Sequence, residues 1–267
     1  MMNKSIRHCL LILSLLFSGT GMADNLVLIQ GYLSDGSGWR NSGVASQLVS
    51  NGWADAGHLR TIPTGVERLP VPGMPQGGKR FYTIYLPTEA PLLVQERLLG
   101  AYIDSIRQQK PNEPIYFAGH SAGGILARLF MIHQPDKGIK GLMTIASPNL
   151  GSGLAETGIK AGNSPLSWFA PMVGANTLNR SQALYHDLVR ERPGNLLFWL
   201  NRQQHPQASY LSVIHTADDV VAPPSQDLRN VAALRGTARS LALPGEHGLV
   251  AANGVMIANW LKDISSK

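Results

Sequence analysis

The segment around Ser121 constrains the fold more than any other part of the chain. The apolar run 114–118 is typical of a strand and residues 124–130 are typical of a helix, with Gly119-His120-Ser121-Ala122-Gly123 between them. A turn this short between a strand and a helix forces the serine at its tip into an exposed position. Glycines are expected at 119 and 123 because side chains there would collide with the neighbouring strand and helix. The alternative is an ordinary Gly-rich loop, which the flanking patterns disfavour.

Strand-like and helix-like segments alternate along the rest of the chain. The run 26–29 is continuously apolar, as expected for a strand that is buried on both faces. The predicted strands are 26–29, 80–86, 114–118, 139–146, 210–215 and 238–243, and the predicted helices are 39–51, 91–109, 124–130 and 250–264. Residues 57–79 are rich in Pro and Gly and are predicted to form a long loop at the rim of a site. The alternation predicts an α/β fold, with a mostly parallel sheet and helices on both faces.

The segment 151–208 departs from this alternation and is predicted to be an insertion over the site. Its large apolar residues, among them Trp168, Phe169, Phe198 and Trp199, stand between Gly, Asn and Pro. Two interpretations stay open. The segment is either a lid whose apolar face lines an acyl pocket, or a set of helices that pack on the sheet edge without touching substrate.

The first 23 residues have the pattern of a secretory signal peptide. Lys4 and Arg7 precede an apolar stretch from Cys9 to Phe17, and small residues that end in Ala23 follow it. The stretch is too short for a stable membrane anchor, although an uncleaved anchor or a buried first helix is the alternative. We therefore expect a signal peptide at 1–23, one α/β domain at 24–267, and export to the periplasm or the culture fluid. Cys9 is the only cysteine, so the mature chain would form no disulfide.

Composition argues for one large domain and against nucleic acid as a partner. The 267 residues are 44% hydrophobic and 15% charged, which suits a single substantial core. The net charge of +6 falls to +4 without the signal segment, and the basic residues are scattered rather than gathered in a run. Such a mild positive surface permits transient contact with a membrane or lipid interface, and a solvated exterior explains it equally well.

A nucleophilic serine needs a base that takes its proton and an acid that orients the base. His247 follows the last predicted strand directly, where a loop brings its imidazole over the carboxyl edge of the sheet to Ser121. Asp218 is the first carboxylate after the strand 210–215 and is the predicted acid, with Asp219 as the alternative. His120 is expected to point away from the serine, and His215, at the end of a strand, is expected to pack in the core.

Acyl transfer also needs two donors for the oxyanion, commonly backbone N–H groups. One is expected from Ala122, the residue after the serine. The other is expected from the loop after the first strand, where Tyr32 is the first choice and Leu33 the second. The alternative is that Gly31 merely permits a tight turn in this loop.

These segments together resemble the α/β-hydrolase superfamily and, within it, the secreted bacterial lipases and esterases. The resemblance rests on Gln30-Gly31-Tyr32, on 119–123, on 144–152, and on Asp218 and His247, in the family's order of nucleophile, acid and base. Two positions depart from the pattern, because many relatives have His where this chain has Gln30 and often have His at the place of Asn149.

The resemblance implies a secreted serine hydrolase, a triacylglycerol lipase or carboxylesterase, that cleaves lipid or acyl esters through an acyl-enzyme on Ser121. It implies small-molecule ester or lipid substrates and no organic cofactor, and the sequence has no motif for a catalytic metal or a nucleotide. A structural calcium ion, as in some lipases, stays open. The same triad also serves thioesterases and amidases, and a non-catalytic protein of this fold that binds a lipid or a partner is a further alternative.

Overall fold

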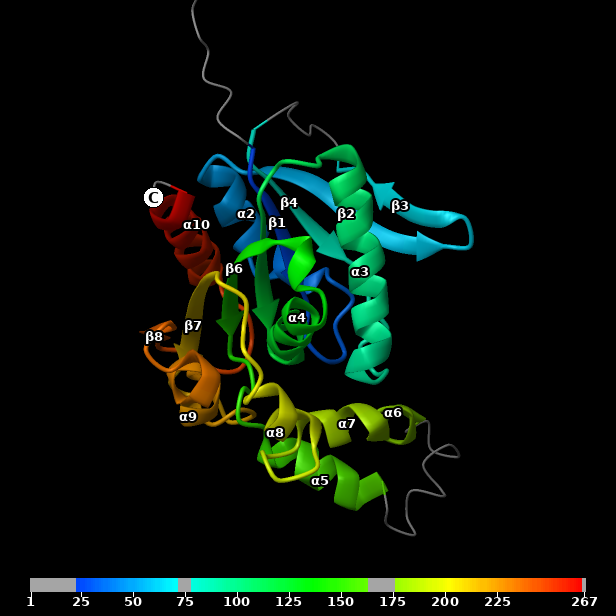
Figure 1. The fold of residues 1–267 in the computed structure, drawn as a ribbon, viewed down its shortest axis with the longest axis vertical. Coiled ribbons are helices and arrows are strands. Elements are labelled where there is room, and N and C mark those ends of the chain that lie inside the picture. Colours follow the sequence, from blue (N-terminus) through cyan, green and yellow to red (C-terminus); the bar gives the residue numbers. More distant parts are fainter. Residues whose placement is uncertain (1–22, 72–77, 163–175, 266–267) are drawn as a thin grey trace, which may run out of the picture.

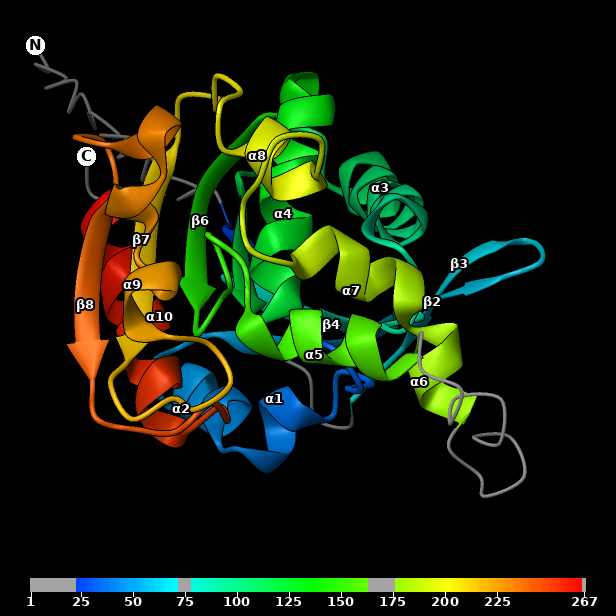
Figure 2. The ribbon, with the colours of Figure 1, turned by 90° about the horizontal axis from the view of Figure 1, so that it is seen from below.

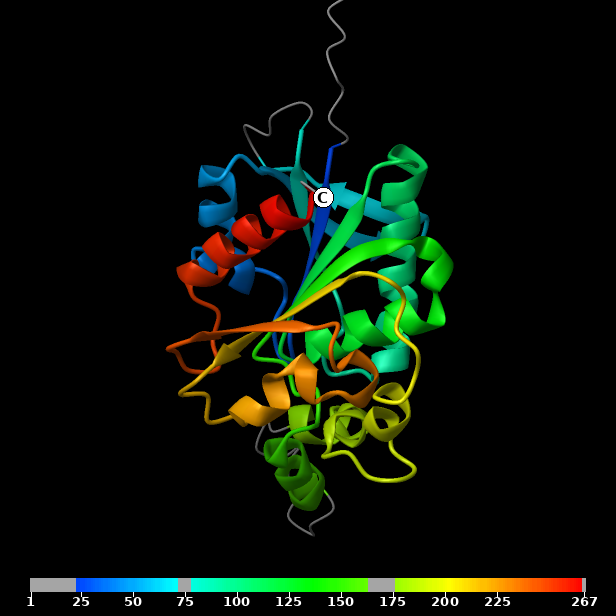
Figure 3. The same ribbon diagram turned by 60° about the vertical axis from the view of Figure 1, so that its left-hand side comes forward.

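Eight strands form one sheet in the order β3-β2-β4-β1-β5-β6-β7-β8 across the residues that this computed structural model describes, 23–71, 78–162 and 176–265. The strands are β1 (Asn25–Ile29), β2 (Ala54–Ile62), β3 (Gly65–Leu69), β4 (Arg80–Ile84), β5 (Ile115–His120), β6 (Ile139–Ile145), β7 (Ser209–His215) and β8 (Arg239–Leu243). All neighbouring strands are parallel except β2 and β3, which form an antiparallel hairpin at one edge. Figures 1 and 3 show the twist of this sheet. The predicted signal peptide lies outside the described residues, apart from Ala23.

Helices cover both faces of the sheet, as predicted (Figure 2). One face carries α3 (Leu92–Gln109) and α4 (Ala122–His133), and the other carries α1 (Gly38–Asn41), α2 (Val44–Ser50) and α10 (Ala251–Ser265). Each face has its own buried apolar cluster. Val27 and Ile29 belong to one cluster and Leu26 and Leu28 to the other, which explains why β1 is apolar at successive positions. Among the helices of the described residues, none is both long and apolar enough to cross a membrane.

The prediction of a long loop at 57–79 is wrong, because β2 and β3 occupy most of the part that is described. β3 is the edge strand and β2 is its neighbour, and both are less buried than the central strands, so they need no continuous apolar run. Gly57 has a φ of 98°, and the pairing with β4 shifts register between Asp55 and His58. A Cβ on Gly57 would lie 2.2 Å from the carbonyl oxygen of Leu69. This glycine therefore marks a β-bulge rather than a loop.

The predicted helix 39–51 is interrupted and forms two short helices, α1 and α2. Gly43 lies between them with a φ of 83°, a left-handed conformation that breaks the helical path. A Cβ at this position would lie 3.2 Å from the Cβ of Ala251 in α10, so the break also lets the two elements approach.

Short helices lie beyond the carboxyl ends of the central strands (Figures 1 and 2). Between β6 and β7 the structure has α5 (Gly153–Gly162), α6 (Asn176–Arg180), α7 (Gln182–Leu188) and α8 (Leu196–Leu200), and α9 (Pro223–Gln226) follows β7. Short 3₁₀ helices are found at Pro135–Lys137, Leu228–Asn230 and Ala232–Leu234. Residues 163–175 of the predicted insertion, with Trp168 and Phe169, lie outside the described residues. That this insertion works as a lid stays a prediction.

A buried guanidinium fastens the segment after α8 to α4. Arg128 of α4 is 0% exposed. It donates hydrogen bonds to Oδ1 of Asn201 at 2.7 Å, to Nε2 of His205 at 3.2 Å and to Oδ1 of Asn149 at 3.3 Å. Burial lowers the pKa of Arg128 to about 9. Because its three partners are neutral, the side chain connects α4 to Asn149 and to the segment after α8 through hydrogen bonds rather than through an ion pair.

The stability of the protein is expected to fall in acid partly through His205. Its Nδ1 donates to the carbonyl of Gln203 at 2.9 Å while Nε2 accepts from Arg128, so the folded chain needs the neutral ring. Burial and the nearby Arg128 charge lower the pKa of His205 to about 3, whereas an unfolded histidine titrates near ~6.5. Between these values only the unfolded chain binds the proton, so the free energy of unfolding falls as pH falls, by up to about 1.4 kcal/mol per pH unit.

We expect the variant His205→Gln, whose amide oxygen can still accept from Arg128, to lose less stability than the unmodified protein between pH 6 and pH 4. Urea unfolding at several pH values measures this slope. The exposed Gln204 provides the control, because Gln204→Asn neither adds nor removes a titratable group and should leave the slope unchanged. An equally steep loss in His205→Gln would contradict the assignment of a neutral His205.

Candidate active site

The backbone makes a strained turn at Ser121, between the end of β5 and the start of α4. Its φ of 51° and ψ of −128° are values that a residue with a side chain rarely adopts, at a cost of about 1–3 kcal/mol. The N–H of Ser121 donates to the carbonyl of Ile145 in the adjacent β6 at 2.9 Å. The turn is thereby fixed to the sheet, and the serine is partly exposed at the carboxyl edge.

Glycines allow the turn to pack this closely, for the reason that the sequence predicts. A Cβ on Gly119 would lie 2.6 Å from the Cα of Gly124, inside the first turn of α4. A Cβ on Gly123 would lie 2.4 Å from the carbonyl oxygen of Ile29 at the end of β1. Real Cβ atoms do not approach other atoms this closely, so both positions require glycine.

The structure brings Ser121, His247 and Asp218 into one chain of hydrogen bonds. Nε2 of His247 lies 2.9 Å from Oγ of Ser121, and Nδ1 lies 2.8 Å from Oδ2 of Asp218. The carboxylate can only accept, so Nδ1 carries the proton and Nε2 is left to accept from the serine hydroxyl. Asp219, the alternative acid, is exposed, and it is Asp218 that reaches His247.

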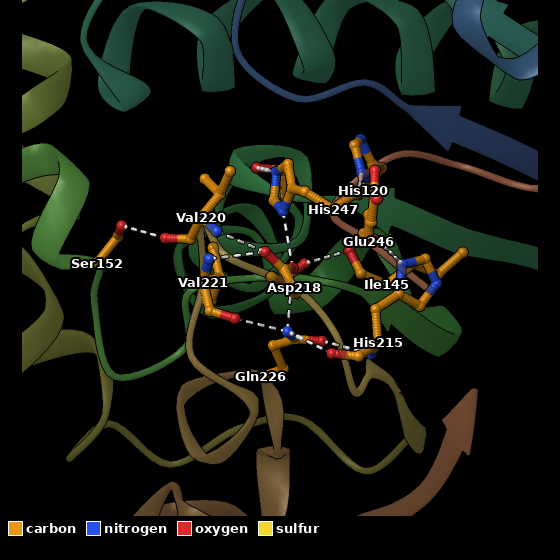
Figure 4. A network of polar contacts seen from close by, with 12 residues as sticks. His120, Ile145, Ser152, His215, Asp218, Val220, Val221, Gln226, Glu246 and His247 are labelled. Carbon is orange, nitrogen blue, oxygen red and sulfur yellow. Dashed lines mark hydrogen bonds and ion pairs between the residues drawn. The ribbon is translucent and has the colours of Figure 1, made fainter. Parts of the chain in front are cut away.

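Four donors surround the carboxylate of Asp218 (Figure 4). Oδ1 accepts from the N–H groups of Val220 and Val221, both at 2.8 Å. Oδ2 accepts from His247 and from Nε2 of Gln226 at 3.0 Å. Burial alone raises the pKa of Asp218, but the hydrogen bonds from His247 and the valine N–H groups outweigh it and lower the pKa below its usual value. The acid is therefore ionised at neutral pH and can stabilise a cationic His247.

Sequence reasoning missed Gln226, which holds the acid in place. This residue of α9 is 0% exposed, and its Nε2 donates to the carbonyl of Val221 at 2.7 Å as well as to Asp218. Its Oε1 accepts from the N–H of His215 at 2.8 Å. A glutamine in a four-residue helix has no sequence signal of its own. Only its place eight residues after the acid, in the turn that follows β7, hints at this contact.

His120 and His215 contact the loop that carries His247. Nε2 of His120 donates to the carbonyl of His247 at 2.9 Å, and Nδ1 of His215 donates to the carbonyl of Glu246 at 2.6 Å. Burial lowers the pKa of His120 to about 4 and also lowers the pKa of His215. His120 therefore does not bond to Ser121, in line with the sequence prediction, and His215 is buried as predicted but also makes polar contacts.

The predicted oxyanion donors lie beside the serine. A Cβ on Gly31 would lie 2.7 Å from the Cβ of Ser121, so the turn after β1 packs closely against this serine. Ala122 is the first residue of α4, where an N–H has no acceptor within the helix. Leu33 has a φ of 56°, which is strained for a residue with a side chain. Within the described residues, the N–H groups of Tyr32, Leu33 and Ala122 have no backbone acceptor, and their role as oxyanion donors stays a prediction.

A cavity of about 310 Å³ opens beside Ser121. Helices α5 and α7 contribute much of its wall, and the segment between β6 and α5, the loop after Asp218 and Tyr32 also line it. The apolar lining residues are Pro148, Leu154, Ala155, Leu188, Val220 and Val221. None of the described lining residues is charged. The serine therefore faces a space that suits an uncharged, apolar group.

Two further polar positions were singled out in the sequence, Asn149 and Gln30. Asn149 is buried and accepts from Arg128, while its amide donates to the carbonyl of Gln226 at 2.9 Å. Gln30 is 2% exposed, and neither atom of its amide has a hydrogen-bond partner in the described part of the chain. In the same residues no three His, Cys, Asp or Glu side chains are gathered as a metal site requires.

Comparison with known proteins agrees with this architecture. The family described as serine aminopeptidase, S33, matches residues 99–193, a stretch that includes Ser121 but neither Asp218 nor His247. No curated protein matches the sequence.

Solved structures match over nearly the whole chain. The mature lipase BlEst2 from Bacillus licheniformis has a TM-score of 0.59 at 14% identity, with 91% of this chain and 92% of that chain covered. Est1E from Butyrivibrio proteoclasticus has a TM-score of 0.58 at 14% identity, with 92% and 90% covered. The metagenomic carboxyl esterase MGS0156 has a TM-score of 0.56 at 14% identity, with 92% and 77% covered. The chain has the α/β-hydrolase fold, as predicted.

We expect Gln226→Leu to lower the free energy of unfolding by about 2–3 kcal/mol, because it removes one of the four donors to Asp218 and the side-chain partners of the His215 N–H and the Val221 carbonyl. Urea unfolding at neutral pH measures the change. Gln203 offers a matched control, since its amide donates only to the exposed carbonyl of Trp199 at 3.0 Å. Gln203→Leu should stay within about 0.5 kcal/mol of the unmodified protein, and similar losses in both variants would contradict the structural role of Gln226.

Proposed function

We propose that the protein is a serine hydrolase that cleaves carboxylic esters with an apolar acyl group. The observation that carries this proposal is the relay from Asp218 through His247 to Ser121, which ends on a serine beside an apolar cavity. The turn at Ser121 is strained, glycines are required around it, and Asp218 is buried in its ionised form. Each of these features lowers the stability of the fold, so packing alone does not account for them. Together they support a nucleophile that is held ready for acyl transfer.

In the proposed reaction, Oγ of Ser121 attacks the ester carbonyl while Nε2 of His247 takes the serine proton. Asp218 stabilises the imidazolium that forms, because its carboxylate already accepts from Nδ1 at 2.8 Å. The carbonyl oxygen becomes an oxyanion, and the N–H groups of Tyr32 and Ala122 are the proposed donors to it. His247 then gives its proton to the leaving alcohol, and the acyl group remains on the serine.

Deacylation repeats these steps with water as the nucleophile. His247 takes a proton from water, the hydroxide attacks the acyl carbonyl, and the imidazolium returns the proton to Oγ of Ser121 as the carboxylic acid leaves. Every proton moves between Nε2 of His247 and an oxygen atom in this cycle. The chain's own residues therefore supply each group that the proposed reaction needs.

The cavity supports an acyl group as the part of the substrate that binds there. Its volume of about 310 Å³ lies at the lower end of the range of roughly 300–1,000 Å³ for small-molecule pockets. Apolar walls favour burial of a hydrocarbon chain by about 25 cal/mol for each Å² removed from water. Since α5 and α7 belong to residues 151–208, the cavity also supports the proposal that this insertion shapes the acyl site.

Peptidase activity is the second candidate, because the matched family is described as serine aminopeptidase. An aminopeptidase has to bind the positively charged amino terminus of its substrate, for which a carboxylate in the pocket is the natural partner. The described residues around the cavity include no Asp or Glu. This lining favours the ester over the peptide, and aminoacyl p-nitroanilides beside p-nitrophenyl esters would separate the two.

We expect the protein to hydrolyse p-nitrophenyl esters, and Ser121→Ala to lower kcat by about 10⁴-fold or more, since the nucleophile is removed. Labelling with a fluorophosphonate should be lost in the same variant. Thermal unfolding of both proteins is the control for folding. Equal labelling of Ser121→Ala, or no hydrolysis of any ester from acetate to palmitate by a folded protein, would contradict the proposal.

We expect Ala155→Leu to shorten the acyl chain that the protein prefers. Ala155 of α5 lines the cavity and is 6% exposed, so a larger side chain occupies space that the substrate would use. The ratio kcat/KM for the longest accepted ester should fall about 10-fold or more relative to acetate. Lys160→Leu, at an exposed position of the same helix, is the control and should keep the original profile. An unchanged profile in Ala155→Leu would place the acyl group elsewhere.

A further inference from the structure

The loop that carries His247 has few anchors of its own. Residues 244–250 connect β8 to α10, and none of their side chains is fully buried. Leu249 alone among them packs partly against the apolar core. Pro244, Gly245 and Gly248 offer no apolar group that reaches the core. A segment with so little packing opens easily, whereas a shift of about 1 Å in a catalytic group can cost about 10²-fold in rate. Something outside the loop has to hold it.

Hydrogen bonds from the segment at the end of β7 hold this loop by its main chain. The N–H of Ala217 donates to the carbonyl of Gly245 at 3.0 Å. The ring of His215, which is 0% exposed, donates from Nδ1 to the carbonyl of Glu246 at 2.6 Å (Figure 4). Glu246 is the residue directly before His247. The bond from His215 thus acts one peptide unit away from the proposed base.

The first turn of α10 fixes which nitrogen of His215 carries the proton. Oδ1 of Asn253 accepts from the N–H of Val250 at 2.9 Å, so the amide nitrogen of Asn253 is the atom that faces His215. That nitrogen lies 3.1 Å from Nε2 of His215, which must therefore accept. The remaining ring nitrogen, Nδ1, is the donor to Glu246. Burial lowers the pKa of His215, which favours the same neutral ring.

His215 is also linked, through Gln226, to the proposed acid Asp218. The main-chain N–H of His215 donates to Oε1 of Gln226 at 2.8 Å, and Nε2 of Gln226 donates to Asp218. The backbone of His215 is thus linked to the carboxylate, and its side chain is linked to the loop of His247. His215 is thus linked indirectly to both partners of the 2.8 Å contact, Asp218 and His247.

We propose that His215 is a positioning residue that holds the loop of His247 at the correct distance from Asp218. The proposal rests on the proposed function for its effect on rate, but its structural part does not require activity. His215 touches neither Ser121 nor the cavity, so it acts through the loop. The bond that matters is the one from Nδ1 to the carbonyl of Glu246, rather than the filling of the core by the ring.

Two amide variants separate these roles, because each keeps one of the two ring contacts. The amide nitrogen in His215→Asn takes the place of Nδ1 and can still donate to Glu246. The amide oxygen in His215→Gln takes the place of Nε2 and can still accept from Asn253. We expect His215→Asn to keep kcat within about 5-fold, and His215→Gln to lose about 10- to 100-fold in kcat with little change in KM. His133→Gln is the control. His133 lies at the end of α4 that is remote from Ser121, so this variant should leave both constants unchanged.

Hydrogen–deuterium exchange of residues 243–250 gives a readout that needs no activity. We expect faster exchange there in His215→Gln, by about 10-fold, and near-original exchange in His215→Asn. The proposal is overturned if His215→Asn and His215→Gln have the same kcat and the same exchange rates. It is also overturned if both variants lose kcat while exchange in the loop stays as in the unmodified protein. If the unmodified protein hydrolyses no ester, the proposed function fails while exchange still decides whether His215 anchors the loop. Should either variant unfold, His215→Leu, which fills the core but can neither donate nor accept, should still raise exchange in the same loop.

Discussion

The close approach of β1, β5, β6 and α4 around Ser121 is the constraint on which the rest of the site depends. The positive φ of the serine is unfavourable by about 1–3 kcal/mol, and it persists because its neighbours leave no other path. Glycines at 31, 119 and 123 each lie where a Cβ would meet another atom within 2.7 Å. In a parallel sheet the carboxyl ends of the strands meet at one edge, so loops from β1, β7 and β8 all reach this turn. The proposed nucleophile is thus positioned by close backbone packing.

The proposed acid, Asp218, and the proposed base, His247, are held in different ways. Asp218 is buried among four donors, and removal of any one of them leaves three, so the carboxylate stays ionised and fixed. His247 stands on an exposed loop that depends on contacts to its carbonyls from other elements. The chain of hydrogen bonds therefore joins a rigidly held Asp218 to a His247 on a weakly packed loop. Its geometry is most sensitive to the main chain around Glu246, even though no chemistry takes place there.

The sequence predicts the centre of the molecule better than its edges, for a physical reason. Strands such as β1 and β5 are buried on both faces, so they are mostly apolar and are easily recognised. The edge strand β3 and its neighbour β2 contain His58, Arg60 and Arg68, and the sequence predicts a loop there. The positions of Ser121, Asp218 and His247 follow from short turns after predicted strands. Gln226 and the polar role of His215 do not, because their partners are main-chain groups and a distant amide that only the folded chain brings near.

Tyr32 connects the turn beside the nucleophile to the insertion. Its hydroxyl donates to Oγ of Ser181 at 3.0 Å and lies 2.6 Å from the hydroxyl of Tyr185, in α7, with the two rings edge to face. Ser181 is 0% exposed, so water does not readily replace these partners. The two interpretations of residues 151–208, a mobile lid and a fixed wall, therefore differ in what happens to the side chain of Tyr32. A lid that swings away has to break both hydroxyl contacts, at about 0.5–1.5 kcal/mol each, and frees the main chain of a proposed oxyanion donor. A fixed wall keeps the contacts and holds that donor against Ser121, so the mobility of α7 and the order of the oxyanion turn are coupled through Tyr32.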